Sequence, residues 1–294
     1  MSYIINSTMN IGIIKKNDFM IGAILGDIIG SPYEGGHRTS VTTTEFPLFS
    51  PNSRFTDDSV LTCATAQALM HPSFLPFSRR FAQQYKQWGM RYSDRGYGSK
   101  FKEWMANPKF SVVNSYANGC MMRCSPIPMM YDRITSLKRA LQSIAYTHAS
   151  PESARGVQSI VEAIWMARNG SSKHEIKARV QEQYGHMLNL TLKELRAKWS
   201  RDIRCNLTAP QALICFMESD NYESAVRNAV YTLGDTDTVA AIAGSIAEAF
   251  YGVQTIPFSM IDEAKIRLTP EMIETVNAFY SKCGADKFGT IFTL

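Results

Sequence analysis

The sequence predicts a single all-α domain, and three features of the chain support this prediction. Apolar residues recur with the period of an amphipathic helix along most of the 294 residues. No alternating apolar and polar run is long enough for a useful strand, and the chain shows no linker, low-complexity tract or internal repeat. With 45% hydrophobic residues, a chain of this length can bury one large core or two modest ones.

The first expected helix begins after a segment without periodicity. Residues 1–17 are predicted to form an N-terminal arm, and the domain is predicted to span residues 18–294. From Asp18 an apolar run continues to Gly30, and its two internal glycines indicate close packing of a buried helix. Asp27 lies inside this run. A buried aspartate needs a charge partner or hydrogen bonds, so Asp27 is predicted to support functional side chains; the alternative is an aspartate on a wet face.

Glu34 follows the end of this helix at Gly30-Ser31-Pro32, on a loop beside two glycines. A carboxylate on such a loop suits a movable lid that reaches a substrate. A solvated loop glutamate is the alternative.

Further helices are expected along the rest of the chain, joined by short loops. Thr191 and Glu194 have the spacing of a capping box, which supports a helix start. A short apolar helix is expected from Cys120, and Pro126 and Pro128 should interrupt it. The other helices are predicted at residues 60–70, 76–90, 100–106, 134–146, 151–168, 172–184, 191–199, 210–218, 222–231, 239–251, 261–268 and 270–283.

Two acidic clusters stand where polar loops turn into apolar helical runs. They are Thr56-Asp57-Asp58-Ser59 and Asp235-Thr236-Asp237-Thr238. Either cluster alone could be a helix cap, because Thr, Ser and Asp oxygens satisfy free N–H groups of a first turn. One cap needs one acceptor, however, and each cluster has two carboxylates. Residues 239–251, which follow the second cluster, are apolar or small on nearly all faces, so this helix should be buried with its acidic end inside the protein.

Buried carboxylates that converge need a cation, because an unpaired buried charge is costly. We therefore expect the two clusters to meet in space and hold a pair of hard metal ions. Ligands that are all oxygen suit Mg²⁺, Mn²⁺ or Ca²⁺ rather than zinc.

Composition narrows the class of protein. The net charge is +5, but no long block of Lys and Arg accompanies it, and specific nucleic-acid binding would need a concentrated basic face. The six cysteines form no CxxC pair and indicate free thiols of a reducing compartment. No apolar run approaches the ~20 residues of a membrane span, and no signal peptide is evident. The expected location is the cytoplasm.

Five motifs occur in one order along the chain. They are Gly26-Asp27-Ile28-Ile29-Gly30-Ser31-Pro32-Tyr33-Glu34, Thr56-Asp57-Asp58-Ser59, Asn114-Ser115-Tyr116-Ala117-Asn118-Gly119 with Met122-Arg123, Thr147-His148, and Leu233-Gly234-Asp235-Thr236-Asp237-Thr238. Through these motifs, residues 20–285 resemble the ADP-ribosylglycohydrolase family, which includes dinitrogenase-reductase-activating glycohydrolases and ADP-ribosyl-serine hydrolases. The resemblance implies a compact, orthogonal helical bundle with a centre of two Mg²⁺ ions, or sometimes Mn²⁺.

The resemblance also implies roles for individual residues. Glu34 is implied as the mobile catalytic carboxylate, with Asp57 contributing to catalysis. The metal ligands implied are Thr56, Asp57, Asp58, Asp235, Asp237 and Thr238. The residues implied along the ADP-ribose cleft are Phe110, Ser115, Tyr116, Asn118, Gly119 and His148, with Phe110 or Tyr116 stacking on adenine.

The function implied is hydrolysis of the glycosidic bond between ADP-ribose and an acceptor, with release of ADP-ribose. Such a reaction needs charge support for an oxocarbenium-like state and an activated water. The expected partners are an ADP-ribosylated protein or a small ADP-ribose conjugate, with nucleic acid only as an ADP-ribosylated acceptor, and the protein is expected to be a monomer. One alternative is a catalytically weak member that binds ADP-ribose or blocks a partner. Another is a different two-metal hydrolase, such as a phosphohydrolase.

Two positions depart from the family pattern. The family usually has Gly at positions 117 and 233, and this chain has Ala117 and Leu233. If those glycines let the backbone approach a ligand, the added side chains would crowd the cleft. The bond cleaved, whether to arginine, serine, a nucleobase or an ester, stays open at this point.

Overall fold

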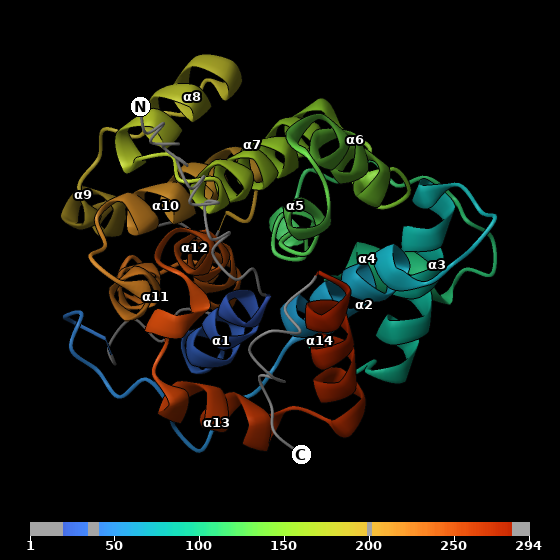
Figure 1. Cartoon of the computed structure of the whole chain (residues 1–294), viewed down its shortest axis with the longest axis horizontal. Coiled ribbons are helices and arrows are strands. Elements are labelled where there is room, and N and C mark those ends of the chain that lie inside the picture. Colours follow the sequence, from blue (N-terminus) through green and yellow to red (C-terminus); the bar gives the residue numbers. More distant parts are fainter. Residues whose placement is uncertain (1–19, 35–40, 199–201, 284–294) are drawn as a thin grey trace, which may run out of the picture.

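The computed structural model describes residues 20–34, 41–198 and 202–283 as an all-α assembly (Figure 1). The predicted fold class is therefore confirmed over these residues, which contain no β-strand. The N-terminal arm expected at residues 1–17 lies outside the described ranges. The helices are α1 (Ile21–Gly30), η1 (Ser31–Tyr33), α2 (Asp57–Met70), α3 (Phe77–Arg91), α4 (Ser99–Ala106), η2 (Asn118–Cys120), α5 (Ile127–Met130), α6 (Arg133–Ile144), α7 (Pro151–Arg168), α8 (Lys173–Tyr184), α9 (Leu192–Ala197), α10 (Cys205–Met217), α11 (Tyr222–Tyr231), α12 (Thr236–Tyr251), η3 (Val253–Thr255), α13 (Phe258–Arg267) and α14 (Pro270–Lys282).

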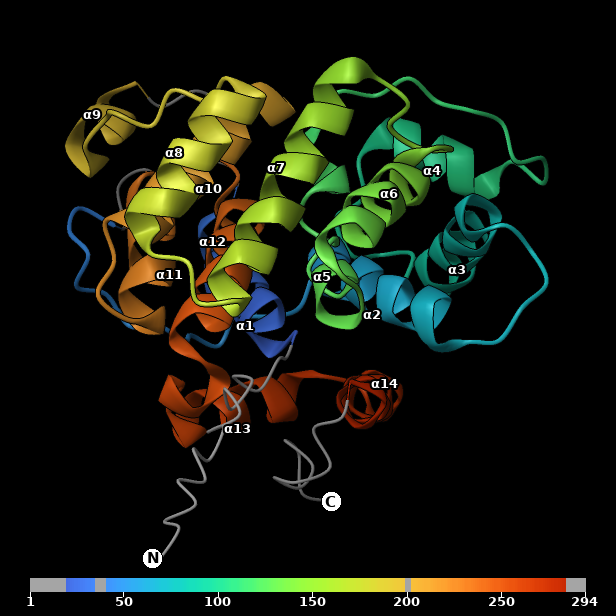
Figure 2. The ribbon, with the colours of Figure 1, turned by 45° about the horizontal axis from the view of Figure 1, so that its top comes forward.

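Helix α12 is the centre of the fold. Every residue from Thr236 to Ala249 is buried, as expected for a helix that is apolar or small on nearly all faces. Helices α1, α7, α10 and α11 pack around it. Figures 1 and 2 both show α1 beside α12 in the interior, with α3, α4 and α6 on one side of the molecule and α8 to α11 on the other.

The packing of α1 against α12 depends on glycines spaced four residues apart, Gly22, Gly26 and Gly30. A Cβ atom at Gly26 would lie 2.1 Å from the carbonyl oxygen of Ala240, and one at Gly30 would lie 2.4 Å from that of Thr236. The predicted close approach of the first helix is therefore confirmed. This contact brings the C-terminal half of α1 to the N-terminus of α12.

Prolines are involved in two of the differences between the predicted and the observed helix boundaries. Helix α10 begins at Cys205 and not at Pro210, which lies in its second turn. Pro210 has no N–H and so removes the backbone hydrogen bond that position 210 would make to the carbonyl of Asn206. The burial of Cys205 and Ala209, both 0% exposed, offsets this loss. The helix expected from Cys120 is instead the 3₁₀ helix η2, and α5 starts after Pro126, because the fixed φ of proline suits a first turn.

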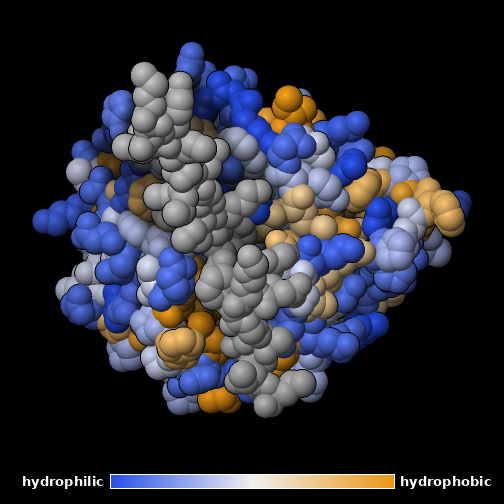
Figure 3. Space-filling view, viewed as in Figure 1, coloured by the Kyte–Doolittle hydropathy of each residue, from blue (hydrophilic) through white to orange (hydrophobic). Residues whose placement is uncertain are grey.

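The surface is mostly hydrophilic on the face drawn in Figure 3, with hydrophobic side chains in several separate groups, one of them at the end formed by α3 and its preceding loop. Within the ranges that the structure describes, no helix is both long and apolar enough to cross a bilayer.

Candidate metal centre and cleft

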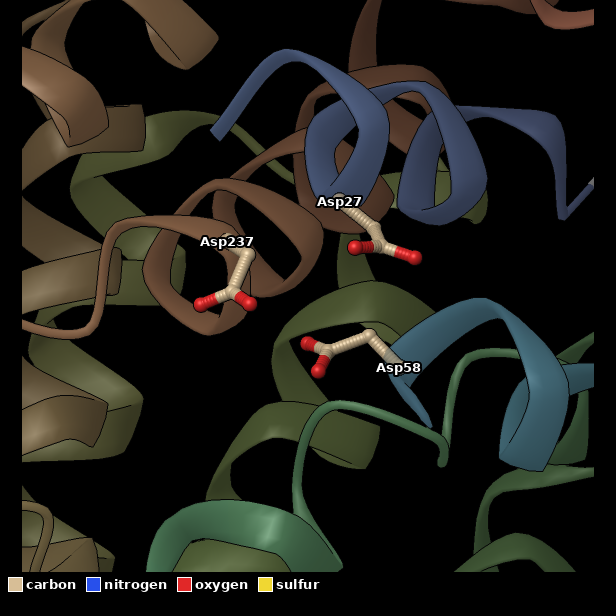
Figure 4. A group of neighbouring side chains, drawn as sticks. All are labelled: Asp27, Asp58 and Asp237. Atoms are coloured by element: carbon tan, nitrogen blue, oxygen red, sulfur yellow. The ribbon is translucent and has the colours of Figure 1, made fainter. Parts of the chain in front are cut away.

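Three aspartates from three different helices point toward one another in the interior. They are Asp27 on α1, Asp58 on α2 and Asp237 on α12 (Figure 4), and one carboxylate oxygen of each lies within 4.8 Å of the others. All three residues are buried. The two acidic clusters of the sequence therefore meet in space, as expected.

Asp27 holds the start of α2 in place. Its carboxylate accepts hydrogen bonds from Thr56 N (2.9 Å), Thr56 Oγ1 (2.7 Å) and Ser59 N (3.0 Å), and also from the Ser59 hydroxyl. The side chain is completely buried. These hydrogen bonds tie Asp27 to the start of α2, and its carboxylate also lies within 4.8 Å of those of Asp58 and Asp237.

Helix capping accounts for only one of the acidic-cluster side chains. Thr56 is the N-cap of α2, and its side chain accepts a hydrogen bond from Asp58 N. Asp235 stands at the N-cap position of α12 but makes no capping hydrogen bond. Instead, its Oδ2 accepts a hydrogen bond from Asn118 Nδ2 at 2.7 Å. The carboxylates of Asp58 and Asp235 are therefore available for another role.

A second carboxylate group shares a member with the first. Glu34, Asp235 and Asp237 also have oxygens within 4.8 Å of one another. Asp237 thus belongs to both groups, as a ligand between two cations would. Glu34 is exposed and stands just after η1. Asp57 is in neither group, but it lines the adjoining cavity, and its backbone N–H donates to Arg95 O at 2.7 Å.

The carboxylates raise one another's pKa. Burial raises the pKa of Asp58 well above its ordinary 3.8, and the charges of Asp27, Asp57 and Asp235 raise it further. Burial and neighbouring carboxylates act in the same direction on the pKa of Asp57 and of Asp237. The Oδ1 atom of Asp58 is buried without a hydrogen-bond partner. An unpartnered carboxylate oxygen inside an all-oxygen group is what a hard divalent cation would satisfy.

A cavity of about 420 Å³ opens from these carboxylates. Its volume is in the range of small-molecule sites. Thr56 and Asp27 lie behind the cavity and do not line it. The predicted site residues that do line it are Glu34, Asp57, Asp58, Ser115, Tyr116, Asn118, Gly119, His148, Asp235, Asp237 and Thr238.

Phe110 does not line the cavity, contrary to its expected place along the cleft. Its ring packs edge-on against Tyr146, with centroids 6.0 Å apart, and the Arg79 guanidinium lies 3.5 Å from its centroid. Both contacts anchor the loop that precedes the cleft. Tyr116, which is 50% exposed and lines the cavity, is the aromatic ring that a base could reach.

Other parts of the cavity wall had no predicted role. Helix α4 contributes Lys100 and Phe101, and Arg123 comes from the turn after η2. Arg123 is 1% exposed, donates to Thr147 Oγ1 at 2.7 Å and lies over the Tyr85 ring. The pKa of His148 is well below its usual 6.5 because the ring is buried and faces this guanidinium, so His148 is neutral at physiological pH. The Met-Arg pair of the third motif was a signal for Arg123, whereas no local pattern marked Lys100.

The two departures from the family pattern differ in their structural effect. Ala117 lines the cavity with an ordinary extended backbone, φ −71°. Leu233 has φ +64° and is the non-glycine residue with positive φ in the described ranges. Its side chain is 6% exposed and does not line the cavity. Leu233 therefore carries backbone strain beside the acidic cluster without crowding the cleft.

Comparison with known proteins identifies the fold that carries this site. The sequence model of the ADP-ribosylglycohydrolase family matches residues 17–286. The chain belongs to the ADP-ribosylglycohydrolase family. A solved structure titled ADP-ribosylglycohydrolase-related protein complex has the same fold, with a TM-score of 0.65 at 23% identity, covering 90% of this chain and 96% of that chain.

Two curated members of the family show how far the sequence similarity extends. The ADP-ribosylhydrolase ARH3 of Homo sapiens is 28% identical over 321 residues, which cover 82% of this chain and 86% of that protein. The ADP-ribosylarginine hydrolase Tri1 of Serratia proteamaculans is 24% identical over 279 residues, which cover 85% of this chain and 75% of that protein. The resemblance inferred from the five motifs is thus confirmed, and the chain is placed among hydrolases of ADP-ribosyl groups.

Proposed function

We propose that the protein hydrolyses the glycosidic bond between ADP-ribose and an acceptor in a reaction that depends on two divalent cations. The observation that carries this proposal is the pair of carboxylate groups that share Asp237 at the end of a 420 Å³ cavity. Relatives named as ADP-ribosylhydrolases support the reaction class.

The residues that would hold the cations are Asp27, Asp58 and Asp237 in one group, and Asp235 and Asp237 in the other, with Glu34 beside the second group. Thr56, Asp57 and Thr238 stand beside them as further oxygen donors. When bound, Mg²⁺ or Mn²⁺ would supply positive charge to the reacting sugar and water. The unpartnered Oδ1 of Asp58 supports this assignment over a purely structural cluster.

Glu34 is proposed as the group that moves protons. As a whole residue it is the exposed member of the two groups, but its carboxyl group is partly withdrawn from solvent; this partial burial and the charge of Asp235 raise its pKa above the ordinary 4.5. A raised pKa brings a carboxylate closer to the working pH of a general acid or base. Asp57, at the cavity wall beside Gly96, is proposed to position the sugar.

The rest of ADP-ribose would extend along the wall formed by residues 115–119. Tyr116 is proposed to stack on adenine, in place of Phe110. The backbone N–H of Gly119 would face the diphosphate, since backbone N–H groups at a helix start suit anions, whereas the N–H of Asn118 already donates to Ile203 O at 2.8 Å. The neutral His148 ring offers its nitrogen atoms to a sugar hydroxyl without adding charge.

The cytoplasm is the proposed compartment, because the five buried cysteines at positions 63, 120, 124, 205 and 215 are free thiols in the structure. The rival function is binding of ADP-ribose without turnover. Ala117, which adds a methyl group to the cavity wall, is the feature that favours it.

The test is release of ADP-ribose from a panel of ADP-ribosylated arginine, serine and nucleic-acid substrates in Mg²⁺. Calorimetric binding of ADP-ribose is measured in parallel. Release from at least one substrate, lost in excess chelator and restored by Mg²⁺ or Mn²⁺, is the expected result. Tight ADP-ribose binding with no release from any substrate would favour the binding protein instead.

A further inference from the structure

Positive charge is concentrated in one part of the chain. Residues 71–149 contain 12 Lys and Arg against three Asp and Glu. The remaining residues contain 19 Lys and Arg against 23 Asp and Glu. No Lys/Arg block marks this segment in the sequence, because its cations are spread over 79 positions. The segment includes α3, α4 and α6, which lie together on one side of the molecule (Figures 1 and 2).

We call this side the basic face. Its cations include Arg79, Arg80, Lys100, Lys102, Lys109 and Arg139. In the part of the chain that the structure describes, none of these six makes an ion pair with a carboxylate. Two of the three acids of the segment are engaged locally: Asp94 pairs with Arg95, and Asp132 accepts the capping hydrogen bond from Thr135 N. Ion pairs with carboxylates therefore do not neutralise these six cations of the basic face.

Aromatic rings hold the arginines of the basic face in position. Arg79 lies 3.5 Å from the Phe110 centroid, while Arg139 and Arg80 lie 3.5 and 4.3 Å from the centroid of Phe77. Two guanidinium groups on one ring repel each other, so an anion between them would be stabilising. Stacked guanidinium groups are also pre-organised to bind phosphate oxygens.

The basic face reaches the carboxylate end of the cavity. The segment that leads into α4 starts at Arg95, whose carbonyl accepts from Asp57 N, and continues through Gly96 and Gly98 to Lys100 in the cavity wall. Lys102 and Lys109 are exposed beyond this point. The loop beside Asp57 thus runs directly into the helix that carries Lys100 and Lys102, so an acceptor that leaves the cavity at Asp57 would lie next to this segment.

We propose that the acceptor that carries ADP-ribose is a single strand of nucleic acid, whose phosphates lie along the basic face. This inference rests on the proposed hydrolase function and names its substrate class. A strand has one negative charge per nucleotide, which suits cations spread over three helices. Phe74 and Val112, which are 110% and 63% exposed in the same segment of the chain, offer apolar surface to unstacked bases. An acidic peptide would satisfy the charges but has no bases for this surface.

Strand binding is tested apart from catalysis, by the fluorescence anisotropy of a labelled, unmodified single-stranded oligonucleotide. If about three phosphates are neutralised, affinity should fall about 20-fold between 50 and 200 mM salt. The double variant Lys102→Glu/Lys109→Glu changes only exposed side chains and should weaken binding about tenfold or more. The control Lys177→Glu/Lys193→Glu, on α8 and α9, should change it by less than about twofold, since it adds the same negative charge elsewhere.

Turnover is then measured with an ADP-ribosylated oligonucleotide, an ADP-ribosylated acidic peptide and a small ADP-ribosyl conjugate. The basic-face variant should raise KM for the oligonucleotide about tenfold with kcat unchanged, and should leave the small conjugate unaffected. Any of three results would overturn the inference while turnover of the small conjugate continued. Strand binding could be insensitive to salt, the acidic peptide could compete with the oligonucleotide equally well, or the two double variants could weaken strand binding equally. Failure to hydrolyse the small conjugate would instead overturn the proposed function, whatever the strand binding.

Discussion

A methyl group at Gly26 would lie 2.1 Å from the carbonyl oxygen of Ala240. Real carbon and oxygen atoms do not approach so closely, so Gly26→Ala must push α1 away from α12. The clash involves backbone, which cannot rotate aside, and we expect a loss of about 2–3 kcal/mol or more in the free energy of unfolding. Urea unfolding followed by circular dichroism measures it.

Gly98→Ala is the matched control for that substitution. Gly98 has φ −61°, and a Cβ atom there would meet nothing within 4 Å. The expected change is within about 1 kcal/mol of zero, because alanine fits this backbone and reduces the entropy of the unfolded chain. If Gly26→Ala lost no more stability than Gly98→Ala, the backbone contact between α1 and α12 would be able to adapt to a methyl group.

Asp237 is expected to control the binding of both cations, since it belongs to both carboxylate groups. The unaltered chain should bind two Mn²⁺ ions, Asp58→Asn should lose one, and Asp237→Asn should lose both. Calorimetry and the paramagnetic resonance of free Mn²⁺ give the stoichiometry, with circular dichroism as the control for folding. Two ions still bound by the Asp237 variant would contradict the shared-ligand arrangement.

The stability of the cation-free protein should depend on pH through the same carboxylates. Burial and mutual repulsion raise the pKa of Asp57, Asp58 and Asp237 above the unfolded value near 3.8. The folded state then binds more protons than the unfolded state, so these groups lower stability as pH rises from about 4 toward neutrality. Melting temperatures in chelator, compared between the unaltered chain and Asp58→Asn, isolate the effect.

Saturating Mg²⁺ should reverse that trend, because a cation binds the deprotonated carboxylates and replaces their protons. At 100 times its dissociation constant, a ligand that binds only the folded state adds about 2.7 kcal/mol per site. A melting temperature that is identical with and without Mg²⁺ at pH 7.5 would argue against a cation site.

Glu34→Gln should slow turnover about 10²–10⁴-fold, the usual contribution of proton transfer, while ADP-ribose affinity changes little. The amide keeps the size and hydrogen-bonding capacity of the carboxylate and removes its basicity. Single-turnover release of ADP-ribose gives the rate, and calorimetry gives the affinity. An unchanged rate would return Glu34 to the role of a solvated loop residue.

Leu233→Gly should leave turnover unchanged within about twofold, because the Leu233 side chain does not line the cavity. Glycine would relieve the strain of φ +64°, about 1 kcal/mol, but would lose the buried side chain, worth about 2 kcal/mol. A small net loss of stability is expected. Ala117→Gly changes a residue that does line the cavity and serves as the comparison. A large gain in turnover rate from either variant would show that the side chain it removes obstructs the cleft.

The acidic clusters were predictable because their signal is local. Hydroxyls and paired carboxylates before an apolar run are visible in a few residues, and the fully apolar faces of α12 showed that its start is buried. The support given by Asp27 followed from one acid inside an apolar run. Each of these inferences needed only the residue types and their spacing.

What the sequence did not predict depends on contacts between distant segments. The ring of Phe110 is held by Arg79 and Tyr146, and neither contact leaves a local pattern. The role of Lys100 follows from where α4 lies against the cavity. Pro210 suggested a helix start, but tertiary packing of the preceding turn extends α10 by five residues.

The three aspartates that point toward one another come from α1, α2 and α12. The long stretch of sequence between α2 and α12 has a consequence for biosynthesis. The segment that contains Asp27 and Asp58 leaves the ribosome long before α12 is made, since Asp237 lies 179 residues after Asp58. Until then, the gap beside the glycines of α1 is unfilled and the acids have no third partner. A nascent or truncated chain that ends before α12 can therefore neither bury α1 against that helix nor complete the group of three aspartates. Pairing across so long a separation is also slow to form, which leaves α1 exposed to chaperones during synthesis.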